Sequence, residues 1–393
     1  MTTIDIPEGS LFGLDNLPYG VFSTPGTAPR VGVRVGDSVV DLAAALGDEV
    51  FAQPSLNAFM AQGYDRWVEV RSRLVSLVQG DVPAAAVFGV DEVRLHLPVE
   101  VADYVDFYAS EHHASNLGRL FRPDAEPLMP NWKHLPVGYH GRSGTVVVSG
   151  TDIVRPCGQR KAPDEDAPTF GESRRLDIEA ELGFIVGVGS PLGSGVSTAD
   201  FTRHVFGAVL VNDWSARDIQ AWEYVPLGPN LGKSFATSIS PWVVPLLALE
   251  AARVPTPVQD PPVLPYLREN EPWGLDVDLS VTWNGQEVSR PPYREMYWSP
   301  AQMLAHMTVN GACSRTGDLY ASGTISGPEK DQRGAFIELT WGGKEPVTVN
   351  GEERSFLLDG DEVSISATAP GAEGRIGFGE VRGRILPATE AKR

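Results

Sequence analysis

Three acidic residues alternate with apolar residues in the segment RRLDIEAELGFIVG. Side chains two positions apart on a β-strand point to the same face, so Asp177, Glu179 and Glu181 would share one face, with roughly 7 Å between successive Cα atoms. A solvated sheet face is one interpretation of this pattern. However, like charges on one face repel, and the segment continues into the apolar FIV. A hard divalent cation such as Mg²⁺ or Ca²⁺ would resolve the repulsion, which makes this segment a candidate metal site.

A second group of chemically active side chains lies closer to the N-terminus. It supplies a hard metal ligand, a phenol, two imidazoles, an amide and a guanidinium within seventeen residues. Clustering in the sequence is weak support for a site, because a single histidine is more often a surface or a satisfied core residue. The group consists of Asp106, Tyr108, His112, His113, Asn116 and Arg122.

The segment from Val209 to Pro245 begins with a strand-like VLV and then becomes polar. The strand would deliver Asp213 to its end, where the carboxylate could join a metal cluster; the competing interpretation is an N-cap for the following helix. Lys233 follows the loop GPNLG, which can bring its ammonium group close to a ligand. Polar side chains at spacings compatible with one helix are Ser215, Arg217, Gln220 and Tyr224.

Two residues nearer the C-terminus could complete a site. Thr324, in the glycine-containing turn ASGTISGPEK, could present its hydroxyl and backbone N–H groups to a ligand. Glu338 lies among apolar residues of GAFIELTW, which we interpret as a strand. A buried glutamate needs a partner, and His113 is the candidate; a surface position at the strand end is the alternative.

Short strands and tight turns must position these groups. The segment VGVRVGDSVVDL, from Val31 to Leu42, alternates around a Gly-Asp turn and predicts a β-hairpin. After Pro54, apolar residues recur at helical spacing. Strand-like alternation returns from about Val93 to Val101, and Pro98 marks a junction between a small N-terminal domain and a larger remainder. The apolar positions of the predicted helix are Leu56, Phe59, Met60, Trp67, Val70 and Leu74.

The larger part consists of strand patterns separated by Gly, Pro and Asn turns. Alternate apolar residues from Val277 to Trp283 share one face, and Asn284-Gly285 suits a type I′ hairpin turn. A second Asn-Gly turn is expected at Asn350-Gly351, after VTV. These meanders predict a mainly β (α+β) fold with antiparallel strands rather than a doubly wound parallel sheet. The sequence contains no GxGxxG or Walker-type loop, so nucleotide cofactors have no support.

Length and composition indicate a globular protein of 393 residues with a main domain and a smaller one. The net charge of −19 argues against nucleic acid or an anionic membrane as a partner, because both bind basic patches. The opening MTTIDIPEGS lacks a signal-peptide pattern, and no apolar stretch approaches the roughly 20 residues of a membrane span, so a cytoplasmic protein is expected. Cys157 and Cys313 suggest neither a disulfide framework nor a zinc site, since they lie far apart.

Six long segments resemble motifs of the fumarylacetoacetase (fumarylacetoacetate hydrolase) family, in that family's order and close to its spacing. FGLDNLPYGVF also matches, so the resemblance covers nearly the entire chain. It implies a small SH3-like N-terminal barrel domain over residues 1–100, a larger C-terminal β-sandwich roll over residues 101–393, and a homodimer. The six segments are DFYASEHHASN, LMPNWKHLPVGYHGR, LDIEAELGFIVG, NDWSARDIQAWEYVPLGPNLGKSF, ASGTISGPE and FLLDGDEV.

Carried over residue by residue, the resemblance implies roles for the matching positions. His113 would be the general base, oriented by Glu338, in cleaving 4-fumarylacetoacetate to fumarate and acetoacetate, the last step of tyrosine and phenylalanine degradation. Arg217, Gln220 and Lys233 match catalytic positions that steady developing negative charge. Matches to substrate-contacting positions are Tyr108, Arg122, Tyr139, Gln220, Tyr224 and Thr324. Matches to positions around a divalent metal, Mg²⁺ or Ca²⁺, are Asp106, Glu179, Glu181, Asp213, Lys233 and Thr237, the last two through backbone or water contacts.

Two rival functions remain open at this point. A lyase that decarboxylates or hydrates a 2-keto acid could use the same scaffold and metal, but the pair of His113 and Glu338 favours hydrolysis. A noncatalytic protein could bind Ca²⁺ structurally, which would leave the arginine, lysine and tyrosine cluster unexplained. The residues favour a hydrolase in which water activated by His113 attacks a metal-chelated diketo acid.

Overall fold

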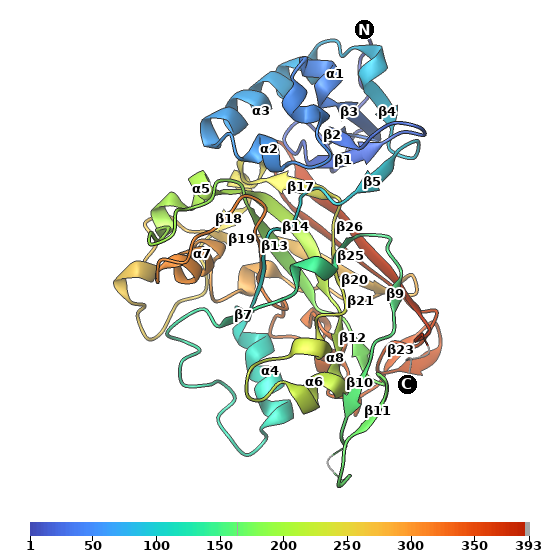
Figure 1. Ribbon diagram of the computed structural model, residues 1–393, viewed down its shortest axis with the longest axis vertical. Helices are drawn as coiled ribbons and strands as arrows, with labels where there is room; N and C mark the ends of the chain where they lie inside the picture. The colour runs from blue at the N-terminus through green and yellow to red at the C-terminus, as the bar shows by residue number, and fades with distance from the viewer. Residues whose placement is uncertain (163, 390–393) are drawn as a thin grey trace.

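The computed structural model describes residues 1–162 and 164–389 and confirms a mainly β fold, with a sheet-rich N-terminal region and a larger C-terminal one (Figure 1). A five-stranded sheet packs through its long last strands against a 13-stranded sheet. The main path of the larger sheet runs through β4 (Val87–Gly89), β3 (Ser38–Asp41), β2 (Arg30–Val35), β1 (Tyr19–Ser23), β17 (Trp242–Pro245), β14 (Val205–Asp213), β13 (Ala180–Val186), β22 (Leu319–Ala321), β6 (Tyr104–Phe107) and β7 (Gly138–His140). The smaller sheet runs through β21 (Gln286–Ser289), β20 (Asp278–Trp283), β25 (Glu362–Pro370), β26 (Arg375–Leu386) and β9 (Ile153–Val154).

The N-terminal region packs helices against its strands and continues the main sheet through the pairing of β1 with β17 (Figure 1). The hairpin predicted from Val31 to Leu42 is confirmed as β2 and β3. The helix predicted after Pro54 is interrupted at Gly63, whose φ of 89° separates two helices, but all six predicted core residues are buried. Of the strand predicted from Val93 to Val101, only β5 (Arg94–His96) forms. The helices here are α1 (Leu42–Leu46), α2 (Asn57–Met60) and α3 (Tyr64–Gln79).

Both predicted Asn-Gly turns close hairpins in the C-terminal region. Asn284 and Gly285 join β20 to β21 with φ values of 50° and 79°, as a type I′ turn requires. Asn350 and Gly351 do the same for β23 (Val347–Val349) and β24 (Glu352–Arg354). Further strands are β8 (Val146–Val148), β10 (Cys157–Arg160), β11 (Thr169–Glu172), β12 (Leu176–Asp177), β15 (Ser215–Ala216), β16 (Thr237–Ile239), β18 (Arg253–Val254) and β19 (Gly274–Leu275). Further helices are α4 (Glu111–Phe121), α5 (Phe201–His204), α6 (Arg217–Glu223), α7 (Pro300–Thr308) and α8 (Phe336–Leu339).

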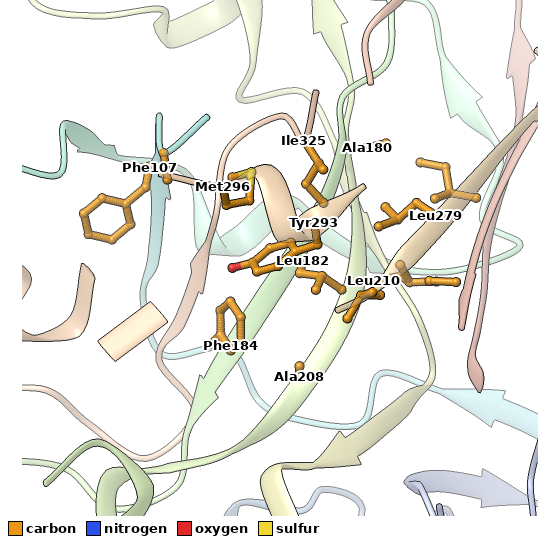
Figure 2. Close-up of a cluster of buried hydrophobic side chains, with 14 of the residues drawn as sticks. Phe107, Ala180, Leu182, Phe184, Ala208, Leu210, Leu279, Tyr293, Met296 and Ile325 are labelled. Carbon is orange, nitrogen blue, oxygen red and sulfur yellow. The ribbon is translucent and has the colours of Figure 1, made fainter. Parts of the chain in front are cut away.

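The central strands β13 and β14 separate two parts of the core. On one face, Leu182 and Leu210 lie opposite each other in register and pack into the cluster that Figure 2 shows. On the other face, Ile185 and Val211 pack with residues of the N-terminal region. Both strands are buried along their whole length, which explains their nearly continuous apolar sequences. No helix of the described residues has the length and apolar character needed to cross a bilayer.

A carboxyl group beside α7 provides a pH-dependent test of this fold. Ser299 caps α7, and its Oγ donates a hydrogen bond to Glu269 Oε1 at 2.5 Å. Burial raises the pKa of Glu269 to about 7, against the opposing effect of this hydrogen bond. The pKa of Glu269 is higher in the folded protein than in the unfolded chain, so protonation of this carboxyl favours the folded state. That contribution to stability is complete at low pH and is lost as pH rises through about 7.

Glu269→Gln should therefore become more stable relative to the natural protein as pH rises from about 5 to about 8. The amide imitates the protonated carboxyl at every pH, so the two proteins should differ least under acidic conditions. Urea unfolding across this pH range measures the difference in the free energy of unfolding. Glu271→Gln is the control, because the Glu271 side chain is 71% exposed. An identical pH dependence for both variants would contradict the role of burial at Glu269.

Candidate active site

Three strands bring carboxylates to one end of the main sheet. Asp106 lies on β6, Glu181 on β13 and Asp213 at the end of β14. Glu181 and Asp213 occupy the face that carries Ile185, because side chains alternate along a strand. Glu179 joins them from the residues just before β13. One ligand atom from each of the four acids lies within 4.8 Å of the others, and all four residues are buried.

Part of this cluster lacks the hydrogen bonds that buried carboxylates require. Both oxygens of Glu181 and Oδ1 of Asp106 have no hydrogen-bond partner among the described residues. Burial raises the pKa of both groups well above the ordinary range; neighbouring carboxylates add to the rise, and Lys233 opposes it. Buried oxygens that repel one another and lack donors have the chemistry of a site for a hard divalent cation. The residues present therefore fit such an ion.

Lys233 and Thr237 reach the same cluster as hydrogen-bond donors. Lys233 Nζ donates to Glu179 and to Asp213 Oδ2, the latter at 2.7 Å, and Thr237 Oγ1 donates to Asp213 Oδ1 at 2.7 Å. Burial alone would lower the pKa of Lys233, but the surrounding carboxylates outweigh burial and raise it. A protonated ammonium group cannot coordinate a cation. The Lys233 side chain instead offsets part of the negative charge of the cluster.

The prediction that Asp177, Glu179 and Glu181 lie on one face of a single strand is wrong. The strand is interrupted after Asp177, which belongs to β12 and not to β13. Its Oδ2 accepts a hydrogen bond from Arg217 Nε at 2.8 Å, and its two oxygens accept from the N–H groups of Phe336 and Ile337 at 2.7 and 3.0 Å. Asp177 is fully buried and satisfied by these donors, so it needs no cation.

Asp177→Asn should lower the free energy of unfolding by about 3 kcal/mol, as expected when one partner of a buried ion pair is removed. The substitution preserves the shape of the side chain but leaves Arg217 with only Glu179 as a charged partner, at 2.8 Å. Urea unfolding measures the loss. The exposed Asp152 provides the control, since Asp152→Asn should change stability by less than about 0.5 kcal/mol. Equal stability of the two variants would show that Asp177 does not compensate the buried positive charge of Arg217.

A buried histidine and glutamate meet between α4 and α8. Ser110 caps α4 by accepting from the His113 N–H, and His113 Nδ1 lies 2.6 Å from Glu338 Oε2. A carboxylate at Nδ1 favours the tautomer that carries its proton there and leaves Nε2 as an acceptor. Burial alone would raise the pKa of Glu338, but His113 and further hydrogen bonds outweigh burial and lower it. This is the geometry of an oriented general base.

Glu338 lies on a helix and not on the predicted strand. The first N–H groups of α8 donate to Asp177, which stabilises a helical turn where the apolar pattern alone suggests extended chain. The surface position considered for Glu338 is also wrong, because this residue is fully buried. His112 is partly exposed, with its Nε2 3.7 Å from Glu295. The structure brings His113, and not His112, to Glu338.

The helix after Asp213 is shorter than its sequence pattern suggests. Asp213 ends β14, and Ala216 occupies the N-cap of α6, so the N-cap interpretation of Asp213 is wrong. The helix contains Arg217 and Gln220, and Arg217 Nη1 donates to Gln220 Oε1 at 3.0 Å. Outside the helix lie Ser215, on β15, and Tyr224, at the C-cap.

The histidine and part of the acidic cluster line one cavity of about 460 Å³. Four buried polar atoms of its lining residues lack a hydrogen-bond partner among the described residues: Asp106 Oδ1, Arg217 Nη2, Thr324 Oγ1 and the Tyr139 hydroxyl. They are available to a ligand. Asp213 and Thr237 line a second cavity, of about 850 Å³, which shares Lys233 with the first. All residues predicted to contact substrate line the first cavity, namely Tyr108, Arg122, Tyr139, Gln220, Tyr224 and Thr324.

Sequence reasoning missed the apolar wall of the first cavity. Leu117 lies four residues after His113 on α4, so helical spacing on this segment contained a signal for it. Leu128 and Trp132 come from the loop between α4 and β7, where no periodic pattern indicates which side chains turn inward. The cavity therefore combines an apolar wall with cationic and hydroxyl groups, as expected of a small-molecule site.

Comparisons with known proteins agree with this architecture. The family model described as "Fumarylacetoacetate (FAA) hydrolase C-terminal" matches residues 103–386, and "Fumarylacetoacetase N-terminal" matches residues 15–98. The chain is 48% identical to the fumarylacetoacetase of Homo sapiens over 99% of both chains, and 44% identical to that of Arabidopsis thaliana over 98% of both. A solved fumarylacetoacetate hydrolase from Exiguobacterium antarcticum, at 18% identity, covers 94% of this chain and 99% of its own with a TM-score of 0.58. The chain belongs to the fumarylacetoacetase family.

Proposed function

We propose that this protein hydrolyses the carbon–carbon bond of 4-fumarylacetoacetate to fumarate and acetoacetate, the last step of tyrosine and phenylalanine degradation. The observation that carries the proposal is a cavity lined by both an oriented base, His113, and buried acids, in a chain whose fumarylacetoacetase relatives match it almost end to end. Such a cavity can combine an activated water, a polarised carbonyl and groups that accept negative charge.

His113 is the group that we assign to activate water. Its Nε2 takes a proton from a water molecule whose oxygen bonds to the carbonyl carbon on the fumaryl side, while Glu338 orients the resulting imidazolium. The carbon–carbon bond then breaks, and its electron pair remains with the acetoacetate fragment as an enolate. Protonation of that fragment gives acetoacetate, and the attacked carbon becomes the new carboxylate of fumarate. One water is consumed, and no oxidant or reductant is needed.

We assign stabilisation of the negative charge that develops as the bond breaks to Arg217, Gln220 and Lys233. Asp177 fixes Arg217 while Arg217 Nη2 has no hydrogen-bond acceptor among residues 1–162 and 164–389, so the guanidinium is organised before the reaction begins. These groups explain how a protein with a net charge of −19 can accept an anionic diketo acid. We assign binding and orientation of the substrate to Tyr108, Arg122, Tyr139, Gln220, Tyr224 and Thr324.

The four buried acids are proposed to hold a divalent cation, Mg²⁺ or Ca²⁺. They are Asp106, Glu179, Glu181 and Asp213, with Lys233 and Thr237 beside them through backbone or water contacts. When bound, such a cation supplies Lewis-acid polarisation of the diketo oxygens. The orphaned oxygens of Glu181 support this assignment.

We further propose a cytoplasmic homodimer with a domain boundary near residue 100. The resemblance to the family supports the dimer, and the family-model matches over residues 15–98 and 103–386 support division into residues 1–100 and 101–393. The continuous sheet through β1 and β17 means that the two parts pack as neighbours along one sheet.

The direct test follows the ultraviolet absorbance of fumarylacetoacetate with purified protein, with added Mg²⁺ or Ca²⁺ and with a chelator. We expect cation-dependent loss of substrate and equal amounts of fumarate and acetoacetate, identified by chromatography. Carbon dioxide or a hydrated product would support a lyase instead. Absence of turnover with either cation would contradict the proposed substrate and direct the search to other diketo acids.

A further inference from the structure

Asn116 lies nearly one helical turn beyond His113 on α4 and contacts the same glutamate. Its Nδ2 donates to Glu338 Oε1 at 2.9 Å. From a different element, the loop after β22, Ser326 Oγ donates to Glu338 Oε2 at 3.0 Å. Glu338 is fully buried, so its charge and its orientation depend on these two donors and on His113.

Ser326 is itself held in place by hydrogen bonds. Its Oγ accepts from the N–H of Gly334 at 3.1 Å, and its carbonyl oxygen accepts from Ser110 Oγ at 3.3 Å. Ser110 also accepts from the N–H of His113 at 3.2 Å. The cap of α4, the serine and the carboxylate thus form one connected network. Of the network's side chains, His113 lines the 460 Å³ cavity, whereas Asn116, Ser326 and Glu338 are absent from its lining in the described chain.

We propose that Asn116 and Ser326 are positioning residues that hold the Glu338 carboxylate in the orientation needed by His113. This inference rests on the proposed function, in which His113 is the base. Asn116 occupies Oε1 and Ser326 shares Oε2, so Oε2 stays directed at His113 Nδ1. Without these donors the carboxylate can rotate about its terminal bond and lose the 2.6 Å contact. The histidine would then populate the tautomer protonated on Nε2, which cannot accept a proton from water.

Asn116→Ala is the principal test, because Asn116 is only partly buried and its replacement leaves no fully enclosed gap. We expect kcat to fall roughly 10- to 100-fold, the loss typical when a hydrogen-bonding partner that orients a metal-binding side chain is removed, while KM changes less than about twofold. Ser115→Ala is the matched control, on the same helix and also partly buried, and should keep the natural kcat. Ser326→Ala should lower kcat in the same way.

Nitrogen-15 NMR of histidine-labelled protein separates positioning from a purely structural role. The natural enzyme should show His113 protonated on Nδ1, and Asn116→Ala should show a mixture of tautomers. A structural role would lower the melting temperature and leave both kcat and the tautomer unchanged. An Asn116→Ala enzyme with natural kcat and a pure Nδ1–H tautomer would overturn the proposal, even if Ser326→Ala fails to fold.

His113→Ala distinguishes this proposal from the proposed function. If His113→Ala turns over substrate at the natural rate, His113 is not the base, and the proposed mechanism fails together with the inference that depends on it. If His113→Ala is inactive and Asn116→Ala is fully active, the mechanism stands and only the positioning role is wrong. Loss of activity in both variants, with a changed tautomer in the second, supports both.

Discussion

Replacing His113 with alanine is expected to lower kcat for fumarylacetoacetate hydrolysis by roughly 10³-fold, within the range that a positioned general base contributes. The residue lines the cavity and, within the part of the chain that the structure describes, its side chain hydrogen-bonds to Glu338 and to no member of the acidic cluster. Cation binding should therefore persist in the variant. The fold should also persist, because Asn116 and Ser326 still donate to the Glu338 carboxylate when the imidazole is absent.

Steady-state kinetics, together with cation content and the melting temperature, checks this expectation. The neighbouring His112 provides a matched control, since it is partly exposed and faces Glu295 instead of Glu338. His112→Ala should retain kcat within about twofold, because it removes no group of the cavity. Natural turnover in His113→Ala, or an equal loss in both variants, would show that the base lies elsewhere.

Local patterns in the sequence predict Glu181 on β13 from the alternation of side chains along a strand, and Asp213 from its position at the end of the strand-like VLV, because neither pattern needs distant information. The same alternation fails at Asp177, whose carboxylate accepts hydrogen bonds from Arg217 and from the N–H groups of α8 and is not one of the four clustered acids. Those partners come from segments 40 and about 160 residues away. Hydrogen bonds to partners this distant leave no periodic signal in the residues around the strand break.

Local sequence patterns also fail around His113, where they reveal neither the helix that carries Glu338 nor the partner of Asn116. A short, mostly apolar segment such as FIEL does not distinguish helix from strand, and the first N–H groups of α8 donate to Asp177. The amide of Asn116 stands in the sequence beside a candidate base, but its partner lies 222 residues away. The cost of burying a glutamate suggested His113 as its partner, and the family resemblance supplied the roles of base and orienting group; the donors that orient this pair are visible only in three dimensions.

Glu181→Gln is expected to remove most of the stabilisation that a divalent cation gives to the folded protein. A cation at 100 times its Kd stabilises the folded state by about 2.7 kcal/mol, so loss of affinity appears directly as a smaller rise in melting temperature. Both oxygens of Glu181 are buried without partners among the described residues, and the other three acids lie around it. An amide has one oxygen ligand where a carboxylate has two, and it carries no charge. We expect affinity for Mg²⁺ and Ca²⁺ to fall by roughly 100-fold.

Without a bound cation, Glu181→Gln should be at least as stable as the natural protein. Glu181 is a carboxylate among carboxylates in a buried cluster, and a neutral side chain of the same shape relieves that repulsion. With chelator present, Glu181→Gln should therefore melt at the same temperature as the natural protein or higher. Glu380→Gln, on β26 with a side chain 53% exposed, is the control and should keep the full response to cation. Melting curves with chelator and with increasing Mg²⁺ or Ca²⁺ separate the two effects.

An undiminished rise in melting temperature with cation in Glu181→Gln would remove this residue from the coordination set. A lower melting temperature of Glu181→Gln in chelator would show that Glu181 stabilises the fold and does not serve to bind an ion.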